Sequence, residues 1–226
     1  YGGNAAMMHY HATPEDHAVL EKKGFLLVDS GATYMDGTTD ITRTYPLGPL
    51  TEDEKRFYTW TLQSHIDLAK AVWLDYCECK MIDTIAREPL WRHLINYRCG
   101  TGHSVSFVGN VHEGPHSLRG TNSVLMRPGM VVTDEPGVYE TDLVGIRIEN
   151  ELVCVHKADN QYGTFLGFEP LMFVPIATSP ILPGVLDKDE IAWLNDYHRQ
   201  VFAKLAPHLN DEERSWLAEK CAAIGC

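Results

Sequence analysis

The sequence predicts a single α+β domain. Strand-like segments joined by a turn come first, two helical segments follow, and two amphipathic helices close the chain after further strands. The chain has 226 residues, of which 44% are hydrophobic, so one sizeable core can form. We therefore expect residues 1–226 to form one domain, with residues 187–226 as a helical tail of that domain.

The elements are predicted in order from local signals. Residues 25–31 and 39–45 are expected to be strands, with Asp36-Gly37 as the turn between them. A capping box at residues 51–54 opens a helix that extends to about residue 72. A second helical region covers residues 80–95, where Pro89 should kink or split the helix.

The second half of the chain contains strands and then two more helices. Residues 130–133 and 145–154 have strand character, and residues 187–205 and 210–224 are amphipathic. Asn210 with Glu213 forms a second capping box at the start of the last helix.

Composition limits the classes of partner and the cellular compartment. A net charge of −12 argues against a nucleic-acid partner, because phosphate binding needs a basic face. We expect no membrane interaction, since no apolar run approaches membrane-spanning length. The start of the chain shows no signal-peptide pattern, so the six cysteines are expected to be reduced thiols of a cytoplasmic protein. Cys77 and Cys79 lack a second Cys or His pair at zinc-site spacing.

Side chains that bind metals or transfer protons gather between residues 100 and 149, most of them close to glycine or proline. They are His103, His112, Glu135 and Glu149. Asp29 and Asp40 are the nearest acidic residues that could complete a two-metal site. Any one of these residues alone is more often a surface carboxylate or a hydrogen-bonded histidine, so the hypothesis depends on the whole set.

The charge of this set favours metal binding. Four carboxylates converging with one imidazole carry a charge of about −4, which is prohibitively costly to bury unpaired. Two divalent cations would cancel that charge. Ligation dominated by oxygen, with a single nitrogen, favours Mn²⁺, Co²⁺ or Fe²⁺ over the sulfur-rich ligation of structural zinc.

The spacing of the two aspartates places a condition on the first hairpin. A two-residue turn at Asp36-Gly37 would pair Asp29 with Thr44 and would leave Asp40 four residues away on the same face. That separation is too large for a shared metal pair. If both aspartates bind, we expect a bulge or a wider loop within residues 32–37.

Five blocks of the sequence resemble, in order, the catalytic domain of aminopeptidase P. The blocks are DSGATYMDGTTDITRT, GTGH, NVHEGP, TDEPGVYE and GIRIENE. Aminopeptidase P is an X-Pro aminopeptidase of the pita-bread metallopeptidase family, which also includes prolidase and methionine aminopeptidase. The resemblance implies a pseudo-twofold α+β core in which helices back a curved, mostly antiparallel sheet.

The resemblance also implies roles for individual residues. Two divalent ions, most often Mn²⁺, with Co²⁺, Fe²⁺ or Zn²⁺ as alternatives, would be held by Asp29, Asp40, His103, Glu135 and Glu149. His9 and His112 match histidines that contact substrate and stabilise the tetrahedral intermediate.

Two further residues are candidates for supporting roles. Strand alternation points Arg147 and Glu149 to the same side, so Arg147 either orients a ligand carboxylate or makes a simple ion pair. Tyr139 either assists the reaction or is a buried tyrosine that bonds to a neighbour.

The expected chemistry follows from two ions that share a water and lower its pKa. Glu135 is the expected proton shuttle to the leaving nitrogen, which in the family belongs to proline. We therefore expect an aminopeptidase acting on peptides with proline at position two. A prolidase that cleaves X-Pro dipeptides, or an inactive fragment or binding module on the same fold, is the alternative; NVHEGP and FEPLMFVPI favour the aminopeptidase. The sequence is also compatible with a homodimer.

Two departures from the family pattern concern the pocket and the chain start. Relatives commonly have a histidine four residues before the metal-binding histidine, and this chain has Cys99 at that position. One alternative for Cys99 is a nucleophilic role. The other is an inert thiol, which is usual for a lone cysteine without a lowered pKa. Relatives begin their catalytic domain before the position of His9 and carry N-terminal domains. We therefore expect this chain to lack the first elements of the domain.

Overall fold

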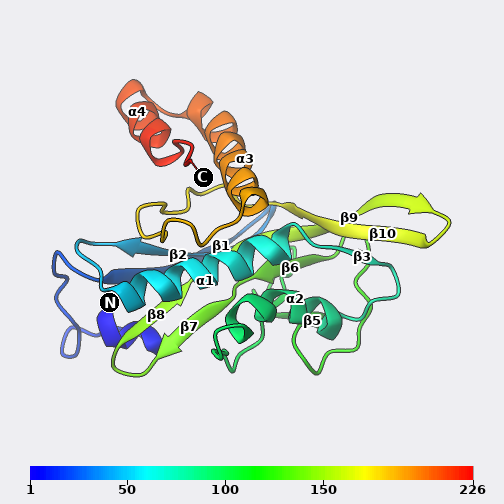
Figure 1. Cartoon of the computed structure of the whole chain (residues 1–226), viewed down its shortest axis with the longest axis horizontal. Helices are drawn as coiled ribbons and strands as arrows, with labels where there is room; N and C mark the ends of the chain where they lie inside the picture. Colours follow the sequence, from blue (N-terminus) through cyan, green and yellow to red (C-terminus); the bar gives the residue numbers. More distant parts are fainter. Residues whose placement is uncertain (226) are drawn as a thin grey trace.

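Three antiparallel sheets form the frame of the molecule in the computed structural model, which describes residues 1–225 (Figure 1). The largest sheet has six strands in the order β3-β10-β9-β6-β4-β5, and the hairpins β1-β2 and β7-β8 form the other two. The strands are β1 (Phe25–Tyr34), β2 (Gly37–Pro46), β3 (Val72–Leu74), β4 (Gly102–Ser104), β5 (Glu113–Leu118), β6 (Val131–Asp134), β7 (Gly137–Glu140), β8 (Val144–Arg147), β9 (Asn150–Asn160) and β10 (Gly163–Pro170).

Helices cover these sheets and complete the core. They are α1 (Glu52–Ala69), α2 (Cys79–Trp91), α3 (Lys188–Leu205) and α4 (Asp211–Lys220), with short 3₁₀ segments at Gly2–Ala6 and Ala206–His208. In Figure 1, α1 lies along the sheets, α3 and α4 stand to one side, and the β9–β10 hairpin extends beyond the rest of the fold. The predicted α+β class with antiparallel pairing is therefore confirmed.

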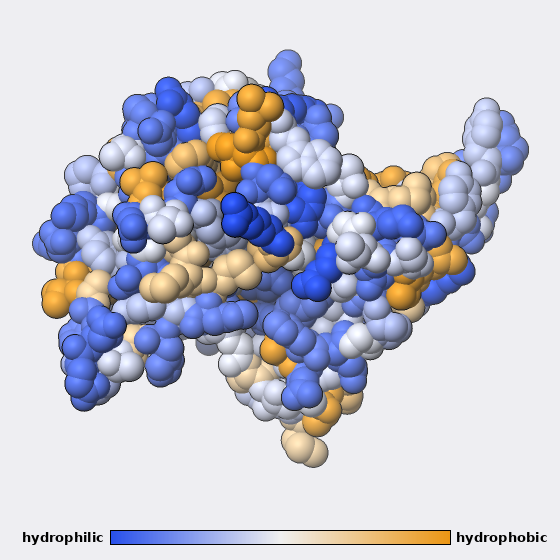
Figure 2. All heavy atoms as spheres, turned by 90° about the horizontal axis from the view of Figure 1, so that it is seen from below, coloured by the Kyte–Doolittle hydropathy of each residue, from blue (hydrophilic) through white to orange (hydrophobic). Residues whose placement is uncertain are grey.

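The core joins elements that are far apart in the sequence. One buried cluster contains Leu62 of α1, Ile146 of β8, and Leu194 and Val201 of α3, so the C-terminal helices pack on the same apolar core as the hairpins. The face seen from below is mainly hydrophilic, with apolar side chains in small groups (Figure 2). Within the described residues, no helix has both the length and the apolar content that crossing a membrane requires.

Both predicted capping boxes are present. Thr51 caps α1 with Glu54 in the reciprocal position, and Asn210 caps α4 with Glu213. The helix predicted to continue to residue 72 ends at Ala69. Pro89 lies in the last turn of α2 and does not split that helix.

The first hairpin differs from the prediction. Its register runs without interruption from Phe25 opposite Pro46 to Tyr34 opposite Gly37, so the turn consists of Met35 and Asp36. The bulge or wider loop expected within residues 32–37 is therefore wrong. Moving the turn by one residue moves the pairing by two, which places Asp29 opposite Thr42 and Gly31 opposite Asp40. The two aspartates are thus diagonal neighbours on one face, closer together than in the predicted register.

A third capping box gives a test of what anchors the C-terminal helices. Asp187 Oδ1 accepts a 2.8 Å hydrogen bond from the Glu190 amide, and Glu190 Oε2 accepts one of 2.7 Å from the Asp187 amide. Because Asp187→Ala removes the cap, we expect it to lower the free energy of unfolding by about 1 kcal/mol in urea denaturation. Asp189→Ala, which removes an exposed charge from the same turn, is the control, and an equal loss in both variants would contradict the capping role.

Candidate metal centre

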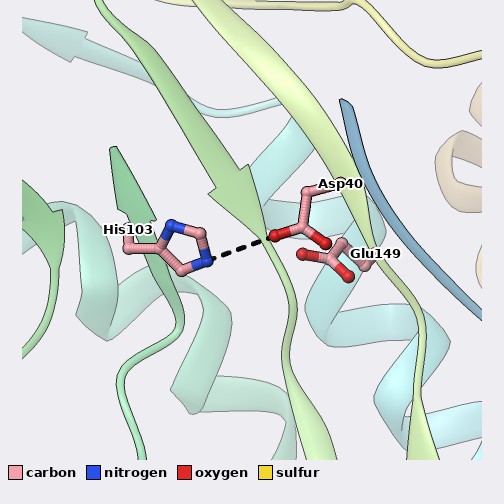
Figure 3. A group of neighbouring side chains, drawn as sticks. All are labelled: Asp40, His103 and Glu149. Carbon is pink, nitrogen blue, oxygen red and sulfur yellow. Dashed lines mark ion pairs between the residues drawn. The ribbon is translucent and has the colours of Figure 1, made fainter. Parts of the chain in front are cut away.

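Strand β2, strand β4 and the two-residue link between β8 and β9 bring Asp40, His103 and Glu149 together. One ligand atom of each residue lies within 4.8 Å of the ligand atoms of the other two. His103 points toward both carboxylates in Figure 3, and its Nε2 lies 3.4 Å from Asp40 Oδ2 and 3.3 Å from Glu135 Oε1. The fold therefore gathers on one imidazole three of the four carboxylates selected from the sequence.

The orientation of His103 suits metal binding. Its Nδ1 lies 3.1 Å from the Ser104 carbonyl oxygen, which can only accept a hydrogen bond. The neutral ring therefore carries its proton on Nδ1 and presents the lone pair of Nε2 to the carboxylates, as metal-binding histidines do. Thr133 Oγ1 accepts a 3.0 Å bond from the His103 amide and donates one of 3.0 Å to Glu135 Oε1, which fixes the two groups relative to each other.

Glu149 shows most directly that a cation fits this cluster. Only 1% of the residue is exposed, and although Oε2 accepts a 2.6 Å bond from the Thr42 hydroxyl, Oε1 is buried without a hydrogen-bond partner. Burial raises the pKa of Glu149 well above its ordinary value, and the charges of Glu135 and Asp40 raise it further. A buried carboxylate oxygen without a partner is costly, and a divalent ion held together with Asp40 and His103 would remove that cost.

Glu135, just after β6, has the electrostatics of a group that exchanges protons near neutral pH. Burial raises the pKa of Glu135 to about 7, although the charges of His103 and Arg147 oppose the rise. The pKa of His103 is also raised: burial acts against the charged ring, but the hydrogen bond to Asp40 and the charge of Glu135 outweigh it. Protons and metal ions therefore compete for the same atoms in this cluster.

Asp29 is held next to the cluster by Arg147. The Arg147 guanidinium donates a 2.7 Å bond to Asp29 Oδ2, and its Nε lies 3.9 Å from Glu135 Oε2. Asp29 does not belong to the group of Asp40, His103 and Glu149. Its second carboxylate oxygen takes no part in the hydrogen bond to Arg147. Arg147 thus forms an ion pair with Asp29, and its role in orienting a ligand carboxylate stays a prediction.

Arg147 also reaches Glu149, but through Thr42. Arg147 Nε donates a 3.0 Å bond to Thr42 Oγ1, whose hydroxyl donates to Glu149 Oε2. Sequence reasoning missed Thr42, although its place two residues after Asp40 in a strand puts both on one face. A third bond of 3.1 Å joins Arg147 Nη1 to the Tyr139 hydroxyl, so the partly buried Tyr139 bonds to a neighbour, and its assistance in the reaction stays a prediction.

Replacing Arg147 with Lys should destabilise the protein although the charge is kept. One ammonium cannot reproduce the planar fork that bonds Asp29, Thr42 and Tyr139 at once, so we expect a loss of about 2 kcal/mol in unfolding free energy. Urea denaturation of metal-free protein measures it. Tyr139→Phe, which removes one of these bonds, should cost about half as much. A Lys variant as stable as the parent chain would contradict this role.

His9 and His112 line the same pocket, next to the cluster of Asp40, His103 and Glu149. The pocket has a volume of about 380 Å³, and its lining includes His9, His103, His112, Glu135 and Cys99. The rings of His103 and His112 have centroids 3.9 Å apart, and burial together with the charge of His103 lowers the pKa of His112. The structure thus brings together the two histidines predicted to contact substrate.

Within residues 1–225, the cysteines show no sign of nucleophilic or metal chemistry. Burial raises the pKa of the Cys99 thiol, and the charge of Glu135 raises it further, so the thiol is not activated. Among the described residues, Cys77, Cys79, Cys99, Cys154 and Cys221 are free, whereas Cys226 lies outside the part that the structure describes.

A histidine and three carboxylates converge between antiparallel strands, and this donor set is of the kind that binds divalent metal ions. The description "Metallopeptidase family M24" matches residues 1–156, and "C-terminal region of peptidase_M24" matches residues 164–224. The chain belongs to metallopeptidase family M24.

Two curated relatives cover almost the whole chain. The probable Xaa-Pro aminopeptidase P of Coprinopsis cinerea is 40% identical over 99% of this chain and 37% of the relative. Aminopeptidase P2 of Arabidopsis thaliana is 43% identical over 96% of this chain and 31% of the relative. The chain therefore spans about a third of the length of these relatives.

Two solved structures show the same fold. The X-prolyl aminopeptidase from Caenorhabditis elegans, described as a cytosolic enzyme with a di-nuclear active site, superposes with a TM-score of 0.92 at 37% identity over 99% of this chain and 37% of that chain. Prolidase from Pyrococcus furiosus gives a TM-score of 0.64 at 27% identity over 75% of this chain and 46% of that chain. These similarities confirm the predicted pita-bread fold.

Proposed function

We propose that this chain is the catalytic domain of an aminopeptidase that uses two divalent metal ions and releases the first residue of peptides with proline at position two. The observation that carries the proposal is the unpartnered, buried oxygen of Glu149 beside Asp40 and His103. The names of the relatives and the di-nuclear site of the C. elegans enzyme support it. Mn²⁺ is the proposed ion, with Co²⁺, Fe²⁺ or Zn²⁺ as alternatives, and the proposed compartment is the cytoplasm.

Five side chains would hold the two ions: Asp29, Asp40, His103, Glu135 and Glu149. Arg147 leaves one oxygen of Asp29 available, and Thr42 leaves one oxygen of Glu149 available. Asp29 and Glu149 would therefore each offer one carboxylate oxygen to an ion, while the second oxygen stays hydrogen-bonded to the protein. Such anchoring orients metal ligands and limits the entropy lost on binding.

The protein's own groups would move the protons and hold the substrate. When bound, the ions would supply a water of lowered pKa and polarise the scissile carbonyl. Glu135, whose pKa lies at about 7 in the metal-free protein, would take a proton from the nucleophile and return it to the leaving nitrogen. His112 would donate a hydrogen bond to the developing oxyanion, and its lowered pKa, which results from burial and the charge of His103, favours the neutral ring.

The pocket beside the cluster would accept the proline ring. Its volume of about 380 Å³ and its lining of His9, Cys99 and His112 suit a small, partly apolar group. A proline nitrogen carries no hydrogen before cleavage, so the site needs no acceptor for it.

Mass spectrometry of an Ala-Pro-Gly tripeptide incubated with the chain tests this proposal. We expect free alanine to appear with Mn²⁺ and to be absent with a chelator. Cleavage of the dipeptide Ala-Pro without cleavage of the tripeptide would instead indicate a prolidase. A folded chain that binds metal and cleaves neither peptide would favour the binding module or inactive fragment. Sedimentation of the purified chain tests the homodimer, which stays a prediction.

A further inference from the structure

His65, a histidine of α1 that is not one of the proposed metal ligands, contacts the chain neighbours of two of them. Its side chain is fully buried. Nδ1 lies 3.3 Å from the Asp134 carbonyl oxygen, and Nε2 lies 3.3 Å from Nδ2 of Asn150. Asp134 directly precedes Glu135, and Asn150 directly follows Glu149. A shift of the His65 ring would therefore move two residues that are each joined to a ligand by a single peptide bond.

Asp134 and Asn150 also form the last pair of a strand ladder. β6 ends at Asp134, β9 begins at Asn150, and the two residues lie opposite each other in the antiparallel register. Glu135 and Glu149 lie beyond this pair at the same end of the sheet, where the β6–β9 ladder no longer holds their backbones. The separation of the two glutamate side chains therefore depends on how firmly this last pair is fixed.

The hydrogen bonds around His65 run in one direction. A guanidinium only donates, and Arg43 Nη2 donates a 2.8 Å bond to Asn150 Oδ1, which fixes the orientation of the Asn150 amide. Nδ2 of that amide must then donate to His65 Nε2, so the neutral ring carries its proton on Nδ1. Nδ1 faces the Asp134 carbonyl oxygen, which can only accept. Two independent neighbours thus require the same tautomer of His65.

Removal of His65 would leave a buried carboxylate without its contact. Asp134 is fully buried, and its Oδ2 lies 3.1 Å from His65 Nδ1. Within residues 1–225, this is the one ion-pair contact that the Asp134 carboxylate makes. Because a buried carboxylate without a partner is costly, the end of β6 would rearrange without His65, and Glu135 would move with it.

We propose that His65 is a positioning residue of the metal centre, which holds the ends of β6 and β9 so that Glu135 and Glu149 keep the separation that a pair of ions requires. The proposal rests on the proposed function, because the two glutamates are ligands only if the chain binds metal there. Loss of the two His65 hydrogen bonds should therefore weaken metal binding in protein that is still folded.

Calorimetric titration of three variants with Mn²⁺ provides the test. His65→Leu removes both hydrogen bonds and should lower the affinity for at least one ion by about tenfold or more, the usual effect of losing a group that orients a metal ligand. His65→Asn keeps a donor at the position of Nδ1 and should recover about threefold or more of this loss. Ile82→Ala, which truncates a buried side chain of α2 outside this network, is the matched control and should keep the affinity within about twofold of the parent.

The absorption spectrum of bound Co²⁺ gives a second readout, because it reports the geometry of the ligands and does not depend on peptide cleavage. The spectrum should change in His65→Leu and match that of the parent in Ile82→Ala. An unchanged affinity and spectrum in folded His65→Leu would overturn the proposal. An equal loss of affinity in Ile82→Ala would also overturn it, since general destabilisation would then explain both variants.

Two further results are decided in advance. If His65→Leu does not fold, His65→Gln, which loses the donor at the position of Nδ1, replaces it with the same expected loss of affinity. A parent chain that binds two ions and depends on His65 for their affinity, but cleaves no peptide, would count against the proposed function alone.

Discussion

Replacing Glu149 with Gln should have opposite effects on the metal-free and the metal-loaded protein. Without metal, the change removes a carboxyl group whose ionised form is disfavoured by burial and whose Oε1 has no partner, so we expect the unfolding free energy to rise by about 1 kcal/mol. With metal, the amide cannot replace the anionic ligand, so we expect affinity for at least one ion to fall about a hundredfold or more, and peptide cleavage to be lost.

Urea denaturation with chelator and then with Mn²⁺ measures both effects. Glu140→Gln is the matched control, because Glu140 is an exposed carboxylate at the end of β7. The control variant should behave like the parent chain in both conditions. If Glu149→Gln destabilised the metal-free protein and left metal binding intact, Glu149 would be a structural residue and the proposed centre would be wrong.

The stability of the metal-free protein should fall as pH rises from about 4.5 to about 7, and Glu135 should account for much of the fall. The pKa of Glu135 is raised from 4.5 to about 7 in the folded chain, so over this interval the folded state keeps a proton that the unfolded state releases. Stability that depends on such a proton is fully present below the unfolded pKa and is lost as pH rises through the folded pKa. The shift corresponds to about 3 kcal/mol once both states are ionised.

Comparison with Glu135→Gln isolates this contribution. Glu149 and Glu151 also have raised pKa values and act in the same direction, so the difference between parent and variant is the quantity to measure. We expect the free-energy curves of the two proteins to diverge between about pH 5 and pH 7.5 in chelator. With Mn²⁺, the unfolding free energy of the parent chain should instead rise with pH, because only the deprotonated ligands bind the ion. Parallel curves in chelator would show that Glu135 titrates as an ordinary carboxylate.

Local interactions explain which parts of the fold were predictable. The capping boxes at Thr51 and Asn210 are formed by groups three residues apart, so the sequence displays both partners. The family blocks appear in register along the chain, and the pita-bread fold and the family membership inferred from them are confirmed. The assignment of individual metal ligands stays a proposal, although three of the four carboxylates lie around His103.

The hairpin between Phe25 and Pro46 shows why some details were not predictable. Asp36-Gly37 is a strong turn signal, yet the turn consists of Met35 and Asp36. Choosing between adjacent turns depends on contacts that the hairpin makes elsewhere. The Thr38 hydroxyl, for example, lies 3.5 Å from the Phe107 carbonyl oxygen, and the Thr33 hydroxyl lies 3.4 Å from the carbonyl oxygen of Gly109. Such contacts cannot be read from a turn signal.

The sequence by itself determined the family, the kind of fold and the set of residue types that could bind metal, because these depend on residue identity and order. Tertiary structure decided which groups meet. It paired Arg147 with Asp29, left Glu149 Oε1 and Glu151 Oε1 buried without partners, and set the pKa of Glu135 at about 7. These properties arise from the burial and proximity of groups up to 118 residues apart, and burial and proximity exist only once the chain is folded.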